Sequence, residues 1–181
     1  MAKQPLVRAL AETSALLCGG TAGIGFATAK ALAGAGVPRL MLAGRSKAKG
    51  AAAADTLRSM YPDAKISHIS ADMTSAEGAM LAVSSAKEVF GCVDLLVNTA
   101  GLSAMPELFF KTPIEEIAPA TNGLLHGTLL PSRAVLPLMM EQGGGCIINV
   151  ASDAGKVLLI SLPGLDLYLS LLRATSVALR Y

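Results

Sequence analysis

The sequence contains no tryptophan, and aromatic residues make up only 4% of its 181 residues. Charge is scarce as well: Asp, Glu, Lys and Arg together make up 15%, and the formal net charge is +2. A balance so close to neutral, with the basic residues scattered along the chain, argues against a nucleic-acid partner. No uncharged apolar run reaches the roughly 18 residues of a membrane span, and no signal-peptide core follows the first methionine. We therefore expect a cytoplasmic protein that binds neither nucleic acid nor a membrane.

Cysteine is also rare, and its placement argues against two kinds of site. Cys18, Cys92 and Cys146 each lie in or beside an apolar run, which is typical of buried free thiols in a reducing compartment. Thiols placed in this way indicate neither a disulfide framework nor a metal centre. The two histidines, His68 and His126, have no metal-ligand spacing around them, so we expect no bound metal.

Apolar residues, by contrast, are abundant and make up 52% of the chain. Short apolar runs alternate with longer segments of helical character. The runs are 15–18, 39–43, 65–69, 93–97 and 146–150, and the helical segments are 23–36, 47–60, 74–90 and 120–141. Thr74, with Glu77 three residues later, predicts a capping box at the start of the third helix. The alternation predicts an α/β fold, a Rossmann-type doubly wound parallel sheet with helices on both faces.

The stretch from Ala15 to Ala27 predicts how the first strand passes into the first helix. An apolar run ends in glycines and opens directly into an alanine-rich segment. Gly19 permits the tight turn, Gly23 lets the backbone approach a phosphate, and Gly25 lets the helix pack closely on the strand. The free N–H groups and the positive end of the helix dipole favour an anion at this point. The stretch therefore predicts a phosphate-binding elbow.

Further distinctive residues follow the other strands at the point where each strand ends. They are Gly44-Arg45-Ser46, Asp72-Met73, Asn98 to Gly101, and Ser152. The carboxyl ends of parallel strands lie at one edge of a sheet, and ligands of such sheets bind beyond that edge. We expect these residues and the glycine elbow to surround one site.

At these positions the chain resembles the short-chain dehydrogenase/reductase family. The family's glycine pattern TGxxxGxG is matched by Cys18 to Gly25, with cysteine in place of the leading threonine, and its NNAG turn is matched by Asn98 to Gly101. Its adenine-contacting aspartate matches Asp72, its helix asparagine matches Asn122, and its serine after the fifth strand matches Ser152. The resemblance implies a nicotinamide dinucleotide cofactor and hydride transfer to or from a carbonyl/alcohol pair.

The choice between the two nicotinamide cofactors depends on the turn after the second strand. A carboxylate there would bind the ribose hydroxyls and repel a 2′-phosphate. This chain has Arg45 and Ser46 instead, and a guanidinium can bind a phosphate through paired hydrogen bonds. We therefore expect NADP(H), with NAD(H) as the alternative. The predicted cofactor contacts are Gly19, Thr21, Gly23, Ile24, Gly25, Arg45, Ser46, Asp72, Met73, Asn98, Ala100 and Gly101.

The match to the family breaks down at the tyrosine and lysine that its catalysis uses. In the usual spacing from the serine, these two positions fall on Leu165 and Leu169. A three-residue insertion puts Tyr168 at the tyrosine position and Leu172 at the lysine position. Neither spacing supplies the lysine, whose charge lowers the pKa of the tyrosine in the family.

Three functions therefore remain open, of which the third is a structural partner that binds no nucleotide. The first is an NADP(H)-dependent oxidoreductase acting on a small carbonyl or alcohol, with Ser152 orienting the substrate oxygen, Asn122 supporting a proton path and Tyr168 donating the proton. The second is a catalytically weakened or inactive relative that binds the dinucleotide and acts through binding or interaction. Asn98 has a structural alternative too, as a turn residue that ties neighbouring strands.

The length of the chain carries its own expectations. We expect residues 1–181 to form one dinucleotide-binding domain without the C-terminal, substrate-covering part of the family. The leucine-rich segment after Lys156 is expected to be helical from about Asp166. The fifth strand is apolar on both faces, so as a sheet edge it needs a cover, from another chain or from a longer form of this protein. By resemblance we expect a homodimer or homotetramer.

Overall fold

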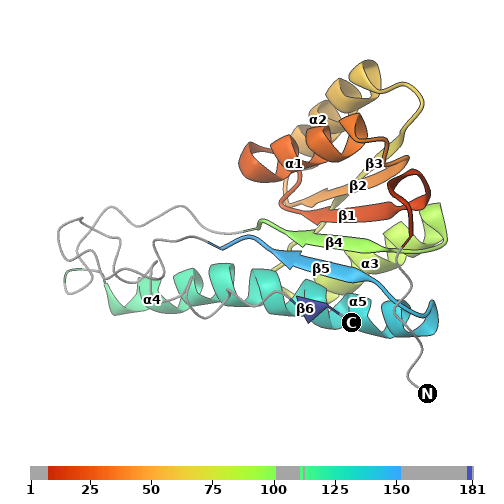
Figure 1. The fold of residues 1–181 in the computed structure, drawn as a ribbon. Coiled ribbons are helices and arrows are strands. Elements are labelled where there is room, and N and C mark those ends of the chain that lie inside the picture. The colour runs from red at the N-terminus through yellow and green to blue at the C-terminus, as the bar shows by residue number, and fades with distance from the viewer. Residues whose placement is uncertain (1–7, 101–110, 112, 152–178, 181) are drawn as a thin grey trace.

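The computed structural model describes residues 8–100, 111, 113–151 and 179–180 of the chain (Figure 1). Its sheet contains five parallel strands in the order β3-β2-β1-β4-β5. Their bounds are Ser14–Cys18 (β1), Arg39–Gly44 (β2), Lys65–Ser70 (β3), Leu95–Asn98 (β4) and Cys146–Asn149 (β5). β1 lies in the middle: β2 and β3 follow it toward one edge of the sheet, and β4 and β5 extend from it toward the other edge. This order confirms the predicted doubly wound parallel fold.

Helices cover both faces of this sheet, α1 and α2 on one side and α3 and α5 on the other (Figure 1). They are the short 3-10 turn η1 (Leu10–Glu12), α1 (Gly23–Gly34), α2 (Lys47–Met60), α3 (Ala76–Phe90), α4 (Ile114–Thr121), the π-helical turn η3 (Asn122–His126) and α5 (Gly127–Glu141). The predicted helix over 120–141 is therefore continuous with α4 and includes a π turn. None of the described helices is both long and apolar enough to cross a membrane.

The central strand β1 shows why the sheet is buried on both sides. Successive side chains of a strand point to opposite faces. Ala15 and Leu17 accordingly join the core beneath α1 and α2, whereas Leu16 and Cys18 join the core beneath α3 and α5. All four are at most 1% exposed. An uninterrupted apolar run, rather than an alternating one, is therefore what a central parallel strand requires.

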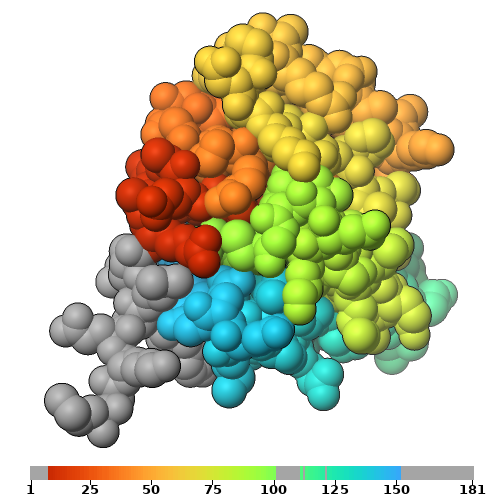
Figure 2. Space-filling view, turned by 90° about the vertical axis from the view of Figure 1, so that its right-hand side faces the viewer, coloured from red at the N-terminus to blue at the C-terminus, as the bar shows by residue number. Residues whose placement is uncertain are grey.

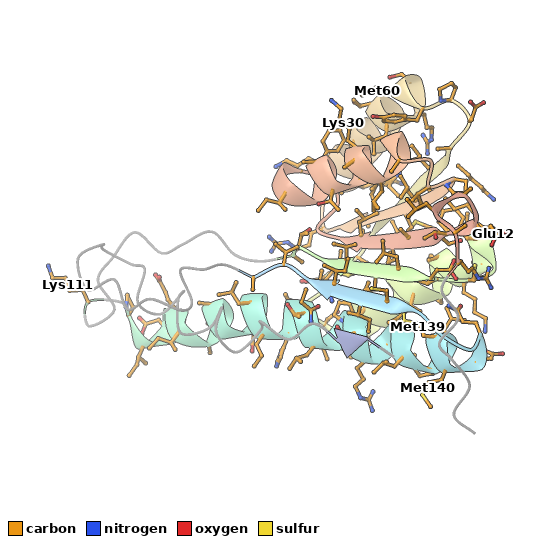
Figure 3. All side chains as sticks on the ribbon, viewed as in Figure 1. Glu12, Lys30, Met60, Lys111, Met139 and Met140 are labelled. Carbon is orange, nitrogen blue, oxygen red and sulfur yellow. The ribbon has the colours of Figure 1, made fainter. Side chains whose placement is uncertain are left out.

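Helix α5 shows the complementary pattern, with one face against the sheet. Met139 points toward the sheet and is 4% exposed, and its neighbour Met140 points away and is 78% exposed (Figure 3). Val135 and Leu138 lie on the buried side with Met139. Pro131 and Pro137 are accommodated within the helix.

The start of α3 differs from the predicted capping box. Ser75, not Thr74, is the N-cap residue, and its Oγ accepts a hydrogen bond from the Gly78 N–H at 3.0 Å. Thr74 instead donates its backbone N–H and its hydroxyl to the carboxylate of Asp72. Because Thr74 is bonded to Asp72, the N-cap lies one residue later than predicted. The predicted capping box of Thr74 and Glu77 is therefore wrong.

The edge of β5 is partly covered by the chain itself. Leu179–Arg180 form β6, which pairs antiparallel with β5 so that Leu179 lies opposite Ile147 and Arg180 opposite Cys146. The expectation that the chain is helical to its end is therefore wrong at these two residues. The remainder of the predicted C-terminal helix lies outside the described residues.

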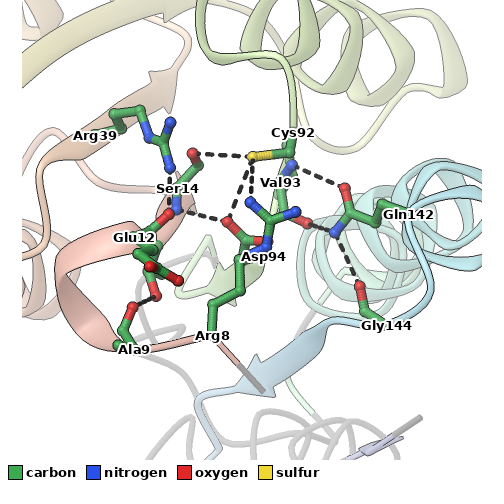
Figure 4. A network of polar contacts seen from close by, with 11 residues as sticks. Arg8, Ala9, Glu12, Ser14, Arg39, Cys92, Val93, Asp94, Gln142 and Gly144 are labelled. Carbon is green, nitrogen blue, oxygen red and sulfur yellow. Dashed lines mark hydrogen bonds and ion pairs between the residues drawn. The ribbon is translucent and has the colours of Figure 1, made fainter. Parts of the chain in front are cut away.

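A polar network lies at the edge of the sheet where the strands begin (Figure 4). The carboxylate of Asp94 accepts a hydrogen bond from the Ser14 N–H at 2.8 Å and pairs with the Arg8 guanidinium at 3.2 Å. The Cys92 thiol lies 3.3 Å from the Ser14 hydroxyl. In Figure 2, which faces this edge, the first described residues, the start of β4 and the start of β5 lie side by side. This network anchors the segment before β1 beneath β1 and β4.

Candidate functional site

An open-sided cavity of about 460 Å³ lies beyond the carboxyl ends of β1 to β4. In Figure 1 these ends point to the left, toward α4. The cavity is lined by Gly19, Thr21, Ala22, Gly44, Arg45, Ser46, Lys49, Ala71, Asp72, Met73, Thr74, Thr99, Ala100 and Gly123. The turns after four strands therefore contribute to one space, as the strand-end argument predicts, and its volume is in the range of ligand sites (roughly 300–1,000 Å³).

The glycine elbow between β1 and α1 forms one wall of this cavity. Gly19 has a φ of +82°, which a side chain would strain, and its N–H donates to the Ala43 carbonyl at 2.9 Å. A Cβ at Gly25 would collide with the carbonyl oxygen of Gly19 and lie 2.5 Å from the Thr99 hydroxyl. Gly23 has a φ of +52° and nothing within 4 Å of where its Cβ would be. The elbow is therefore close-packed at Gly25 and open at Gly23.

The first turn of α1 is available to a ligand. Ala22 is the N-cap residue, and no side chain caps the helix. Uncapped N–H groups at a helix N-terminus are donors without an intrahelical acceptor. Of the predicted contacts in the elbow, Gly19 and Thr21 line the cavity, whereas Gly23, Ile24 and Gly25 do not. Ile24 is 66% exposed and Gly25 is buried beneath it.

The turn after β2 supplies the positive charge of the site. Arg45 and Ser46 line the cavity, and Ser46 also caps α2 by accepting a hydrogen bond from the Lys49 N–H at 3.3 Å. The Ser70 hydroxyl donates to the Arg45 carbonyl at 2.9 Å, which fixes this turn to β3. Lys49 was not predicted. Its signal in the sequence is the four-residue spacing from Arg45, which places it one turn into the helix that Ser46 begins.

The turn after β3 supplies a carboxylate. Asp72 Oδ1 accepts hydrogen bonds from the Thr74 N–H at 2.9 Å and the Thr74 hydroxyl at 2.8 Å. These two bonds, helped by the charge of Arg45, hold the pKa of Asp72 below its ordinary value. Met73 lines the cavity from beneath and is 3% exposed. Asp72 therefore organises its own turn and stays ionised at the mouth of the cavity.

The turn after β4 divides its side chains between the core and the cavity. Asn98 is 2% exposed, and its Nδ2 lies within hydrogen-bond distance of the Thr128 carbonyl, the Ser132 Oγ and the Asn149 Oδ1. Its amide is thus directed at α5 and β5, and Asn98 does not line the cavity. These contacts match the structural alternative, in which Asn98 ties neighbouring elements together.

The two residues after Asn98 face the cavity. The Thr99 hydroxyl donates to the Cys18 carbonyl at 2.8 Å, and the Thr99 N–H donates to the same oxygen at 2.9 Å. This pair of hydrogen bonds fixes the β4 turn against the glycine elbow. Thr99 and Ala100 then line the cavity between the elbow and η3.

The far wall comes from the π turn before α5. Asn122 begins this turn and is exposed, and the next residue, Gly123, lines the cavity. A Cβ at Gly127 would lie 3.4 Å from the Ala100 carbonyl oxygen, so the helix passes close to the β4 turn. Single π turns within helices occur frequently at functional sites. The predicted residues Gly101, Ser152 and Tyr168 lie outside the described residues.

Comparisons with known proteins match this arrangement to one family. Residues 13–164 match the family described as short chain dehydrogenase. A 3alpha-hydroxysteroid dehydrogenase of Mediterraneibacter gnavus is 35% identical over 138 residues, which is 76% of this chain and 54% of that protein. A 2-(R)-hydroxypropyl-CoM dehydrogenase of Xanthobacter autotrophicus is 36% identical over 110 residues, 60% of this chain and 42% of that protein.

The fold is matched by solved structures as well. A short-chain type dehydrogenase/reductase from Mycobacterium marinum superposes with a TM-score of 0.84 at 26% identity, covering 91% of this chain and 65% of that one. The chain spans about half the length of the curated relatives it matches.

Proposed function

The chain belongs to the short-chain dehydrogenase family, and on this premise we propose that it is an NADP(H)-dependent oxidoreductase acting on a small carbonyl or alcohol. The observation that carries the proposal is the cavity beyond β1 to β4, which joins an uncapped helix N-terminus to a basic turn. Both named relatives are dehydrogenases of hydroxylated compounds, which supports this substrate class.

The residues around the cavity fit a dinucleotide in chemistry. The first turn of α1, with open space at Gly23, suits the pyrophosphate, since free N–H groups there favour an anion. Asp72 and Met73 suit the adenosine, and Arg45 and Ser46 suit a 2′-phosphate. When bound, the nicotinamide would supply or accept the hydride.

The preference for NADP(H) over NAD(H) is supported by the turn after β2. No carboxylate of the described residues lines the cavity at this turn, where one would bind the ribose hydroxyls and repel a phosphate. Arg45 is exposed at the rim and forms no ion pair with a described carboxylate. Its guanidinium is therefore available for a phosphate.

The residues proposed for the chemistry are Ser152, which would orient the substrate oxygen, Tyr168, which would exchange the proton, and Asn122, which would support a proton path. Without a lysine beside it, a tyrosine titrates near 10, about three units above neutral pH. That difference corresponds to about 4 kcal/mol of driving force for proton transfer. We therefore expect slow turnover from this chain.

A second function, dinucleotide binding with little or no catalysis, is favoured by one observation: both registers put leucine, Leu169 or Leu172, at the lysine position. Binding and turnover assays on the full chain separate the two. At a ligand concentration a hundredfold above the dissociation constant, NADPH should stabilise the protein by about 2.7 kcal/mol, which a thermal melt detects.

The three outcomes of these assays are distinct. Stabilisation by NADPH together with oxidation of NADPH in the presence of a panel of aldehydes and ketones supports the oxidoreductase. Stabilisation without turnover supports the binding function. A melting temperature that neither NADPH nor NADH changes would refute both.

A further inference from the structure

The charges around the cavity are unevenly balanced. Among the described residues, three charged side chains line it: Arg45, Lys49 and Asp72. The charge of Arg45 acts on the Asp72 carboxylate, which is one cause of the lowered pKa of that group. Two of the three charges are positive and one is negative. Neither Arg45 nor Lys49 forms an ion pair with a described carboxylate.

Lys49 also lies at a junction between two hollows. It lines the main cavity and, with Thr21 and Ala22, a second hollow of about 290 Å³ between α1 and α2. The remaining residues of that second hollow, Phe26, Ala52, Ala53 and Thr56, carry no charge. Lys49 is therefore the charged residue that both hollows share.

The backbone of Lys49 is fixed although its side chain is exposed. Its N–H donates to the Ser46 hydroxyl oxygen at 3.3 Å, and both residues line the cavity. The side chain is thus anchored within one helical turn of Arg45. A flexible ammonium anchored in this way can approach a phosphate that binds beside Ser46.

We propose that Lys49, acting beside Arg45, contributes to the preference of this site for a nucleotide carrying a 2′-phosphate. The inference rests on the proposed function and names a specificity-determining residue of the same site. The formal charge of the three described lining groups is +1 with Lys49 and zero without it. A phosphate monoester carries about −1.5 to −2 charges at pH 7. Because Lys49 is hydrogen-bonded to Ser46, at the turn proposed to hold the 2′-phosphate, its charge acts mainly on that phosphate and less on the 5′-phosphate or pyrophosphate, which nucleotides with and without the 2′-phosphate share.

The experiment compares Lys49→Met with Lys47→Met. Lys47 is the first residue of α2, is exposed and lines neither hollow, so its replacement removes the same charge from the same helix. The probes are adenosine 2′,5′-bisphosphate and 5′-AMP, which differ only in the 2′-phosphate, followed by NADPH and NADH. Dissociation constants are measured by calorimetry on the full chain.

We expect Lys49→Met to weaken adenosine 2′,5′-bisphosphate and NADPH about five- to tenfold while leaving 5′-AMP and NADH unchanged. Lys47→Met should change each by less than about twofold, because an exposed charge at a greater distance is screened. The effect of Lys49→Met should shrink as salt is raised, for the same reason. Both variants should unfold at the wild-type urea concentration.

Three results would overturn the inference. In the first, the two variants behave alike. In the second, Lys49→Met weakens the probes with and without the 2′-phosphate equally. In the third, it weakens neither, while the wild type still prefers NADPH; the proposed function then stands and the selectivity belongs to another residue. If the wild type binds none of the four probes, the proposed function itself fails, and the inference fails with it.

Discussion

Replacing Gly25 by alanine tests the close packing of the elbow on which the proposed site depends. The added Cβ would collide with the carbonyl oxygen of Gly19 and lie 2.5 Å from the Thr99 hydroxyl oxygen. The Gly19 carbonyl belongs to the backbone, and the Thr99 hydroxyl is held by its bond to the Cys18 carbonyl. Neither group can rotate away, so α1 must shift outward from β1 and β4.

The expected cost is the difference between two opposed terms. Overpacking of this kind costs about 1–3 kcal/mol. The higher helix propensity of alanine returns at most about 1 kcal/mol. The clash is with backbone, so we take the overpacking cost at its upper end of about 3 kcal/mol and the return at about 1 kcal/mol. The expected net loss in the free energy of unfolding is then about 2 kcal/mol, which for a chain of this size lowers the melting temperature by about 4–8 °C.

The matched control is Gly34→Ala, at the other end of the same helix. There the nearest atom to the added Cβ is the Tyr61 hydroxyl oxygen at 3.3 Å, the mobile end of a side chain. Melting followed by circular dichroism should show Gly34→Ala at or slightly above the wild-type temperature and Gly25→Ala well below it. Equal melting temperatures for the two variants would show that the elbow is not close-packed, and the account of the site would be wrong.

Two further predictions concern residues outside the cavity lining. Burial raises the pKa of the Cys18 thiol to about 12 from 9.0, so the folded state disfavours the thiolate. The free energy of unfolding should therefore fall by up to about 1.4 kcal/mol per pH unit as the pH rises above 9. Urea unfolding at pH 9 and pH 10.5 should show a smaller fall in Cys18→Ala than in the wild type. Asp94→Ala should cost about 2 kcal/mol in urea unfolding, because it leaves the Ser14 N–H and the Arg8 guanidinium without their acceptor. Asp55→Ala, which breaks an exposed pair, should change the same measurement by less than about 0.5 kcal/mol, and a similar loss in both variants would contradict the role given to the Asp94 network.

Two differences from the sequence-based predictions come from hydrogen bonds to particular partners. Thr74 and Ser75 are both good N-cap residues. Thr74 does not cap the helix because its N–H and its hydroxyl are both bonded to the Asp72 carboxylate, so Ser75 takes that position. Asn98 follows a strand like the other site residues, yet its side chain points at α5. Its three partners lie 30 to 51 residues later in the chain, so no local pattern could have indicated that direction.

The sequence by itself determined the fold and the position of the elbow. Apolar runs separated by helical segments require a parallel sheet, and glycines between the first run and the first helix mark where backbone must come close to backbone. These are properties of short stretches, and such stretches carry their own conformational preferences. Which side chains share the cavity was decided only by the tertiary structure. Strand order brings Asp72 to the same cavity as Arg45 and Lys49, and packing against α5 directs the side chain of Asn98 away from it, because proximity between distant segments depends on packing and not on spacing along the chain.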